Sequence, residues 1–430
     1  MHSLIFLEPG HFHAALTLRA PNPRVDDEIH LYARTGAERD AFLALVASFN
    51  ARAAQPTAWR VRVHEHAEPI DALVAERREG LVILAGRNDT KLATIARLHA
   101  AGFDVLADKP WLTRAEALPH LETVTAGPPL AMDIMTSRFD ITARLLRRIR
   151  ACEALFGDLR RDGAEPAIEL ASVHHLYKVV NGRPLRRPPW YYDVDVQGDG
   201  LVDIQSHMVD QVQWQLEGEQ GDDRDWNADE DVELVAARRW STEVPLALYR
   251  ESTGEERFPE RLRAELDGGV LALAANGELE YRLRGVHVRQ RAEWRQREPE
   301  GGGDLHAAVL RGTRAEVTLT QGPETGFRPR LRLAPRDGAG DALESLVAES
   351  QGEFPGLAAR AAEGGYELTL PAALDSGHES HFPMVLDACL DHLESGRWPR
   401  ALARRISLRY TLLARGRELA LGMRTASLPS

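Results

Sequence analysis

Short apolar segments alternate with helix-compatible segments through the first hundred residues, and this rhythm restricts the fold more than any other feature. Strands are expected at residues 3–7, 28–33, 60–63, 80–86 and 103–107. Helical patterns fill most of the intervals, at residues 11–18, 37–50, 69–78 and 91–101. Strands separated by helices form a parallel sheet covered on both faces. Such sheets bind ligands beyond the carboxyl ends of their strands.

The pattern changes after about residue 150, where expected strands follow one another closely with Gly and Pro between them. They are expected at residues 167–176, 232–238, 246–250, 270–274, 278–283 and 315–319. This spacing favours a mostly antiparallel, open sheet. The tail is expected to be helical at residues 381–396 and 401–421. A chain of 430 residues suits two domains, which we place at 1–145 and 146–430, the second an α+β domain.

Composition excludes several classes of protein. A formal net charge of -12 opposes binding to nucleic acid, which needs a basic surface. The two cysteines, Cys152 and Cys389, are too few for a disulfide framework. No apolar run approaches the roughly 18 residues of a membrane span, and the first residues lack the basic start of a signal peptide. We therefore expect a cytoplasmic, globular protein that binds neither nucleic acid nor membrane.

The turn after the first strand is the expected cofactor site. A Rossmann-type dinucleotide-binding turn reads G-x-G-x-x-G, and the same frame here holds Glu8, Gly10 and His13. Only the middle glycine is present, so Gly10, His11 and Phe12 are the candidates for contact with the pyrophosphate. The alternative is an ordinary strand–helix turn in which His11 and His13 cap or pack.

The second strand ends without the carboxylate that would bind the ribose of NAD. Arg34 follows it instead and favours the 2′-phosphate of NADP. An exposed loop arginine is the competing interpretation.

Polar residues also follow the later strands. Gly86 and Asn88 follow strand 80–86, and Asp108 and Lys109 follow strand 103–107. Lys109 is one of only three lysines in a chain that otherwise uses arginine. An ammonium can give up a proton in a reaction, whereas a guanidinium cannot.

A further motif lies in the second half of the chain, where a Gly-rich entry leads into Asp203, His207 and Asp210. If this segment is helical, the spacing of four and then three residues places the three side chains on one face.

These motifs together resemble the Gfo/Idh/MocA oxidoreductases, which include inositol dehydrogenases and glucose–fructose oxidoreductase. The family's Glu-Lys-Pro is similar to Asp108-Lys109-Pro110, and its Asp-x-x-x-His-x-x-Asp is similar to residues 203–210. Asn88, Arg138-Phe139 and the Gly157 turn also resemble family motifs in the same order. The resemblance covers residues 1–216, and the degraded glycine fingerprint places the chain in a divergent branch.

The resemblance implies an NAD(P)-dependent enzyme that transfers a hydride to or from a hydroxyl-bearing carbon of a sugar or polyol. It assigns proton transfer to Lys109 and His207, and substrate orientation to Asp203. The cofactor would be held by Gly10, His11, Phe12, Arg34, Gly86, Asn88 and Asp108. Substrate contacts are expected from Arg138, from Trp190 in the aromatic, Pro-rich segment 181–192, and from His381.

Relatives of this kind assemble as homodimers or homotetramers, which is therefore expected here. Two other functions remain open, namely an NAD-dependent glycosidase that oxidises its sugar transiently and a non-catalytic dinucleotide-binding protein. No metal site is predicted, because His378-Glu379-Ser380-His381 lacks the His-Glu-x-x-His spacing and a third ligand.

Overall fold

The computed structural model describes residues 1–180, 183–217, 225–336 and 340–422, which form two compact units. The first unit combines residues 1–136, 190–198 and 377–414. The second combines residues 137–189 and 199–376 with the end of the chain from residue 415. Each unit is therefore built from segments that are distant in the sequence. Among the helices of the described residues, none has both the length and the hydrophobicity needed to cross a membrane.

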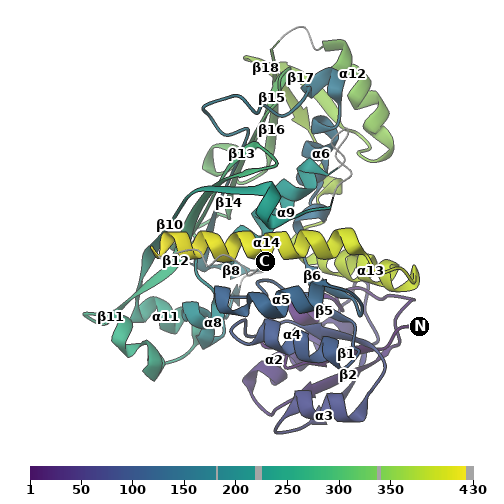
Figure 1. Ribbon diagram of the computed structural model, residues 1–430, viewed down its shortest axis with the longest axis vertical. Coiled ribbons are helices and arrows are strands. Elements are labelled where there is room, and N and C mark those ends of the chain that lie inside the picture. The colour runs from purple at the N-terminus through teal and green to yellow at the C-terminus, as the bar shows by residue number, and fades with distance from the viewer. Residues whose placement is uncertain (181–182, 218–224, 337–339, 423–430) are drawn as a thin grey trace. The chain divides into compact units, whose positions relative to one another are not determined.

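A six-stranded parallel sheet forms the centre of the first unit (Figure 1). The strands lie in the order β3 (Arg60–Glu65), β2 (Glu28–Ala33), β1 (Leu4–Leu7), β4 (Leu81–Leu84), β5 (Val105–Asp108) and β6 (Ala131–Ile134). This is the strand order of doubly wound dinucleotide-binding sheets. All four residues of β1 and of β4 are buried, as expected for central strands covered on both faces. The predicted parallel sheet is confirmed.

Helices cover this sheet in pairs. Helix α1 (His13–Leu16) packs on α2 (Ala37–Asn50), and α4 (Lys91–Ala100) packs beside α5 (Leu118–Thr125), as Figure 1 shows for the second pair. The remaining helix of this part of the chain, α3 (Pro69–Glu76), contacts β2.

The first helix is much shorter than the predicted 11–18, and that prediction was wrong at both ends. The backbone N–H groups of Gly10 and His11 both donate to the carbonyl oxygen of Ala85, at 3.0 and 2.9 Å. These bonds fold residues 10 and 11 into a turn on β4 rather than into the helix. At the other end, the backbone N–H groups of Leu18 and Arg19 donate to the carbonyls three residues back, Ala15 and Leu16, at 2.9 and 3.1 Å, so the α-helical bonding stops at Leu16.

The C-terminal helices complete the core of the first unit. Helix α13 (His381–Glu394) contacts α1 and β6, and α14 (Arg400–Ala420) follows it. Arg409 on α14 forms an ion pair with Asp133 on β6, and both side chains are almost fully buried. The next residue, Tyr410, stacks on Trp111 with ring centroids 5.5 Å apart. The N-terminal sheet is therefore packed against residues from the end of the chain.

The second unit contains a ten-stranded sheet. The strands on its path are, in spatial order, β10 (Val232–Pro245), β12 (Val270–Leu283), β13 (Val286–Arg297), β7 (Ile168–Tyr177), β14 (Leu305–Arg311), β15 (Ala315–Gln321), β16 (Arg330–Pro335), β18 (Gly365–Thr369) and β17 (Ala358–Ala362), with β11 (Leu266–Asp267) paired to β12. Every pairing is antiparallel except that of β13 with β7. The predicted, mostly antiparallel sheet is confirmed.

Two predicted strands differ from the structure. Residues 246–250 are not a strand but the start of helix α11 (Leu246–Thr253). Its first residues, Leu-Ala-Leu, are good helix formers, and Pro245 ends the preceding strand.

The predicted strands at 270–274 and 278–283 are one continuous strand, β12, which passes through Asn276 and Gly277 without turning. A Cβ on Gly200 would lie 2.1 Å from the Asn276 carbonyl carbon, and a Cβ on Gly277 would lie 2.4 Å from the Gly200 oxygen. Gly277 therefore serves a close backbone approach rather than a turn.

Helix α9 (Gln205–Leu216) begins later than predicted. Asp203 lies in the preceding turn, so the idea that Asp203 and His207 share a helical face was wrong. The carboxylate of Asp199 accepts the backbone N–H of Leu201 at 3.0 Å, and the Asp203 carbonyl accepts the Ser206 hydroxyl at 2.6 Å. These bonds hold residues 199–204 as a turn that precedes the helix.

Candidate functional site

The carboxyl edge of the six-stranded sheet gathers most of the predicted cofactor residues. The turn after β1 carries Gly10, His11 and Phe12, and it lies against the end of β4 through the bonds to Ala85. A Cβ on Gly86 would lie 2.7 Å from the Glu8 carbonyl oxygen, so glycine is required there for the two strand ends to meet.

Two histidines converge on the carboxylate at the end of β5. The Nδ1 atom of His13 lies 2.9 Å from Oδ2 of Asp108, and Nδ1 of His11 lies 3.5 Å from the same oxygen. The other oxygen, Oδ1, accepts the backbone N–H of Lys109 at 3.0 Å. Asp108 is buried, with 6% of its side chain exposed, and the two imidazoles are 14% and 12% exposed.

Burial determines the protonation of this cluster. Desolvation, assisted by the neighbouring His11, lowers the pKa of His13 to about 3. Burial also disfavours the charged form of Asp108, but the histidines and Lys91 outweigh it and hold the pKa of this carboxyl well below its usual range. At neutral pH the His13 imidazole is therefore neutral and Asp108 is ionised.

Lys91 is a buried cation behind this cluster. Its Nζ donates to the side-chain oxygen of Asn88 and, at 2.9 Å, to the backbone carbonyl of Asp108. The Asn88 amide nitrogen in turn donates to the Gln197 carbonyl at 2.8 Å. The carboxamide of Asn88, predicted to bind the cofactor, thus bonds to protein groups at both ends.

Trp190 lies near the turn after β1, which carries Gly10, His11 and Phe12 and is called the first turn below. Its Nε1 donates to Oε1 of Glu38 at 2.8 Å, and a guanidinium nitrogen of Arg87 lies 3.7 Å from the same oxygen. The other carboxylate oxygen of Glu38 would be 2.8 Å from a Cβ on Gly10. Of the segment that contains Trp190, residues 181 and 182 lie outside the described part of the chain.

The contact between Glu38 and Gly10 tests whether the turn suits a dinucleotide. A pyrophosphate must approach the backbone at the middle glycine, and here an anionic carboxylate already does so. Trp190 and Arg87 supply the donors that an anion at this point needs. A pyrophosphate would have to displace the Glu38 carboxylate from Gly10, and it would then meet these two donors.

Arg34, the predicted reader of a 2′-phosphate, lies just after β2 and is 58% exposed. Its guanidinium contacts the carboxylates of Glu8 and Glu68 at 3.2 and 3.6 Å. A phosphate would have to compete with these two carboxylates for the guanidinium.

The predicted catalytic residues are divided between the two units. Lys109 belongs to the first, directly after β5, whereas Asp203 and His207 belong to the second. Asp203 is buried, and His207 lies on α9.

Arg138, a predicted substrate contact, also belongs to the second unit. It donates to both carboxylate oxygens of Asp210, at 2.7 and 2.9 Å. Its position is therefore defined by a residue of α9.

Another group of charged and imidazole side chains lies on β7 and β14 of the second unit and on the residues next to them, Lys178 and Asp304. Asp304 accepts from Lys178 at 2.8 Å and lies 3.2 Å from Nδ1 of His174 and 3.5 Å from Nδ1 of His175. Burial lowers the pKa of the nearby His306 to about 4. None of these residues was predicted as a site residue.

His381, predicted to contact substrate, is buried at the start of α13. Its ring lies 6.3 Å from that of His378, whose Nε2 is 3.2 Å from the Thr136 hydroxyl. His378 in turn lies 6.1 Å from the ring of His13. The start of α13 therefore adds imidazoles beside the cluster at the end of β5.

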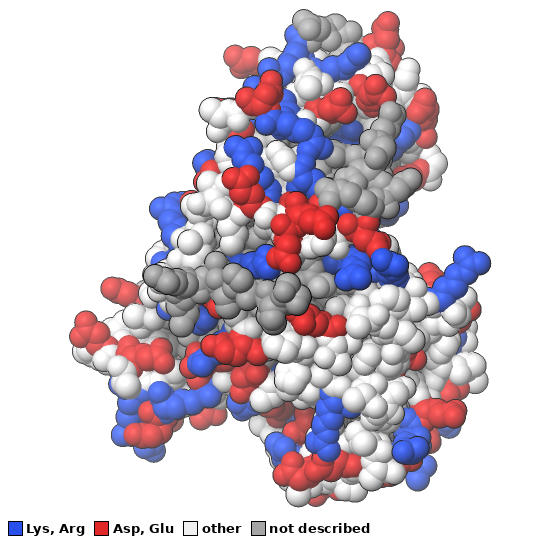
Figure 2. Space-filling view, viewed as in Figure 1, with Lys and Arg blue, Asp and Glu red and all other residues white. Residues whose placement is uncertain are grey.

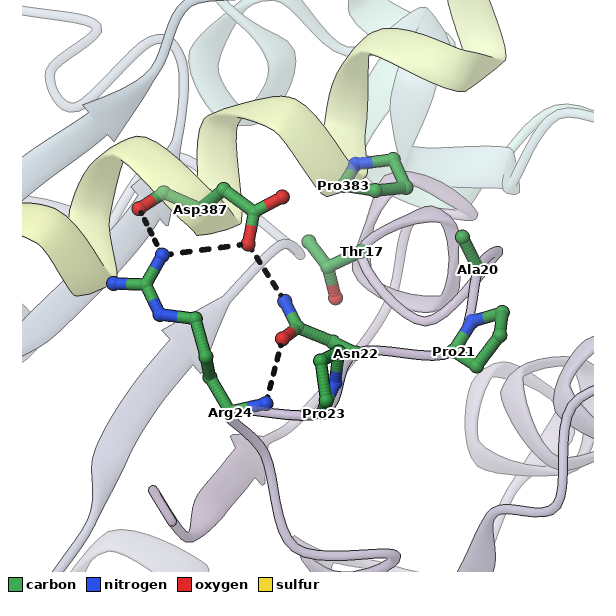
Figure 3. Close-up of a pocket in the computed structure, with 8 residues that line it drawn as sticks. All are labelled: Thr17, Ala20, Pro21, Asn22, Pro23, Arg24, Pro383 and Asp387. Atoms are coloured by element: carbon green, nitrogen blue, oxygen red, sulfur yellow. Dashed lines mark hydrogen bonds and ion pairs between the residues drawn. The ribbon is translucent and has the colours of Figure 1, made fainter.

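Figure 3 shows a separate cavity of about 380 Å³ between the loop after α1 and helix α13. Asn22 donates to the carboxylate of Asp387 at 2.8 Å, and Arg24 lies 3.7 Å from the same oxygen. Prolines 21, 23 and 383 form much of the remaining wall. Asn22, Arg24 and Asp387 bond to one another, and the Thr17 hydroxyl donates to the Ala14 carbonyl at 2.7 Å, so this cavity is less suited to chemistry than the sheet edge.

The main residue that sequence reasoning left out of the site is His13, which was treated as a capping or packing residue. Lys91, Glu38 and Arg87 were also left out. The available signal was the His-x-His spacing directly after β1, together with a carboxylate at the end of β5.

Comparison with known proteins identifies the family. A family model described as "Putative oxidoreductase C terminal domain" matches residues 145–421, more than half of the chain. The chain belongs to this oxidoreductase family. A structure described as a "putative oxidoreductase" from Parabacteroides merdae is 33% identical, covers 98% of both chains and has a TM-score of 0.92. No curated protein matches the sequence.

More distant structures share the fold of this oxidoreductase. One from Erwinia carotovora atroseptica has a TM-score of 0.57 at 14% identity, over 96% of this chain and 98% of its own. KijD10, a 3-ketoreductase from Actinomadura kijaniata in complex with NADP and TDP-benzene, has a TM-score of 0.55 at 15% identity, over 100% and 99% of the two chains. At these identities the likeness concerns the fold.

Proposed function

We propose that this oxidoreductase uses NAD or NADP to transfer a hydride to or from a hydroxyl-bearing carbon of a sugar or polyol, as in the Gfo/Idh/MocA enzymes. The observation that carries the proposal is the first turn, where the Glu38 carboxylate approaches Gly10 at the carboxyl edge of a sheet with the dinucleotide-binding strand order. The NADP carried by KijD10 on the same fold supports it.

The dinucleotide would supply the hydride acceptor or donor. Gly10, His11 and Phe12 would hold its pyrophosphate, with Trp190 and Arg87 as donors, and Arg34 would contact the adenosine ribose. Gly86 allows the turn to lie against β4, and Asn88 with Lys91 fixes the residues after β4 and β5. Trp190 is thereby moved from the predicted substrate contacts to the cofactor.

Hydride transfer from an alcohol also requires that its hydroxyl proton be removed. We assign this proton transfer to Lys109 and His207, and substrate orientation to Asp203. A small-molecule substrate, a cytoplasmic location and assembly as a homodimer or homotetramer are parts of the same proposal.

Mass spectrometry of the purified protein tests the cofactor, first under native conditions and then after denaturation. A mass added in the native state and released as NAD(H) or NADP(H) on denaturation would support the proposal. Calorimetry then measures binding of the four dinucleotides to protein freed of cofactor. Absence of binding for all four at millimolar concentration would refute it.

Assays of turnover distinguish a dehydrogenase from the two alternatives, an NAD-dependent glycosidase and a non-catalytic dinucleotide-binding protein. Formation of reduced dinucleotide from a polyol is the expected result. Release of free sugar without net reduction would identify a glycosidase that oxidises transiently, and binding without turnover would identify a non-catalytic protein.

A further inference from the structure

The end of β5 carries a group of side chains that the proposed function does not use fully. His11, His13 and Asp108 each offer one ligand atom, and these three atoms lie within 4.8 Å of one another. The carboxylate oxygen is 2.9 Å from one imidazole nitrogen and 3.5 Å from the other. They come from the turn after β1, from the first residue of α1 and from the end of β5, all in the first unit.

We propose that His11, His13 and Asp108 form a binding site for one divalent transition-metal ion, such as Zn²⁺ or Fe²⁺. Ligands at about 2.1 Å from a common ion lie ~3–4 Å from one another, and the observed spacing needs little adjustment to reach that range. Two histidines and one carboxylate are a common ligand set for these ions. The proposal does not rest on binding of a dinucleotide.

The hydrogen bonds around Asp108 orient its carboxylate so that one oxygen, Oδ2, would bind the metal. Oδ1 accepts the Lys109 backbone N–H, which leaves Oδ2 directed at the two imidazoles. Such outer hydrogen bonds fix the orientation of a metal ligand. Lys91 is the nearby cation that would oppose a metal, but its Nζ bonds to the backbone carbonyl of Asp108 rather than to the carboxylate.

Packing also fixes one of the imidazoles. The ring of Phe382 on α13 lies 4.6 Å from that of His13, and the ring of His11 lies 4.0 Å from it. An imidazole binds a metal through the lone pair of a ring nitrogen, and Nδ1 of His13 is the nitrogen that lies next to Asp108. A site of three protein ligands keeps at least one position open, as catalytic metal sites do. Water or the oxygen of a hydroxyl or carbonyl group could occupy it.

A second group within the described residues brings together His175, Glu298 and Asp304 in the second unit. There the carboxylate of Asp304 already pairs with the ammonium of Lys178 at 2.8 Å. This cation compensates its charge, so the group is the less suitable of the two. It provides a matched control for the first.

The test uses the full chain without an affinity tag, because a histidine tag binds metals itself. Elemental analysis of the purified protein is followed by removal of metal with a chelator and titration with Co²⁺, read by visible absorption and calorimetry. We expect one equivalent of Co²⁺ to bind, with ligand-field bands of low coordination number, and Zn²⁺ to displace it. The titration is performed without dinucleotide, so its result is independent of cofactor binding.

Variants locate the ion. We expect His11→Asn, His13→Asn and Asp108→Asn each to weaken Co²⁺ binding by more than about 100-fold, whereas His175→Asn binds as the wild type does. Circular dichroism of the metal-free proteins checks folding, and the three separate substitutions protect the test against the failure of one of them. No binding of Co²⁺ or Zn²⁺ to the wild type, unchanged binding by the folded variants, or loss of binding in His175→Asn would each overturn the proposal.

Discussion

The guanidinium of Arg138 binds both carboxylate oxygens of Asp210, with Nε to Oδ2 at 2.7 Å and Nη2 to Oδ1 at 2.9 Å. Only 1% of the Asp210 side chain is exposed, and Arg138 also lies 5.8 Å from the ring of Trp214, one turn further along α9. This geometry gives Arg138 a role in positioning α9, whereas the sequence suggested contact with substrate.

Replacing Arg138 with Met should therefore destabilise the protein. Removal of one partner from a buried ion pair typically costs about 3–5 kcal/mol. Thermal unfolding, monitored by circular dichroism, should show a clear fall in Tm. The double variant Arg138→Met/Asp210→Leu should recover part of the loss. An unchanged Tm with a raised KM would instead assign Arg138 to the substrate.

The packing of Gly86 predicts a second effect. A Cβ in Gly86→Ala would meet the Glu8 carbonyl oxygen at 2.7 Å and force the first turn away from β4. We expect a loss of about 1–3 kcal/mol in stability and weaker dinucleotide binding, measured by denaturation and calorimetry. Gly127→Ala is the control, because nothing lies within 4 Å of its Cβ position. Equal behaviour of the two variants would show that the contact is unimportant.

Lys109→Arg keeps the charge after β5 but removes a group that can readily transfer a proton. On a confirmed substrate, turnover should fall roughly 10²–10⁴-fold, the usual contribution of general acid–base catalysis. Dinucleotide affinity, measured in parallel, should change little. Near-normal turnover would exclude Lys109 from the chemistry.

Arg34 tests the choice of cofactor. If its guanidinium reads a 2′-phosphate, Arg34→Ala should weaken binding of NADP(H) more than binding of NAD(H), because only NADP(H) carries that group. Calorimetry with both dinucleotides measures the ratio. Equal losses would mean that Arg34 only pairs with Glu8 and Glu68.

His306 predicts a dependence of stability on pH. Burial, with the neighbouring His174, lowers its pKa from 6.5 to about 4. Between these values the unfolded chain binds the proton and the folded chain does not, so the free energy of unfolding falls as pH decreases from 6.5 to 4. The shift corresponds to roughly 3 kcal/mol. Denaturation at several pH values should show a shallower slope for His306→Gln, and an unchanged slope would contradict the assignment.

The sequence was sufficient for the parallel sheet because runs such as Leu4–Leu7 and Leu81–Leu84 are apolar throughout, which is typical of strands buried on both faces. The sequence was insufficient at Gly277, where a break between two strands was predicted and one continuous strand, β12, is found. The reason for that glycine is a backbone contact with Gly200, far away in the sequence, and local pattern indicates only a turn.

The candidate site shows the same limit. Strand order alone indicates that the turn after β1 and the end of β5 share one edge of the sheet, so His11 and Asp108 could be predicted together. The direction of the His13 side chain depends on two contacts. The backbone N–H groups of Gly10 and His11 bond to the Ala85 carbonyl after β4, and the His13 ring packs against Phe382 of α13. Neither can be read from the neighbouring residues.

The buried pair of Asp133 and Arg409 has a consequence for synthesis of the protein. The carboxylate leaves the ribosome 276 residues ahead of the guanidinium that neutralises it. At about 5–20 residues per second, the interval is roughly 15–55 s. Burial of an unpaired carboxylate is costly, so the nascent N-terminal sheet cannot complete its core during this interval. The N-terminal sheet therefore reaches its final packing only after the segment around Arg409 has been made.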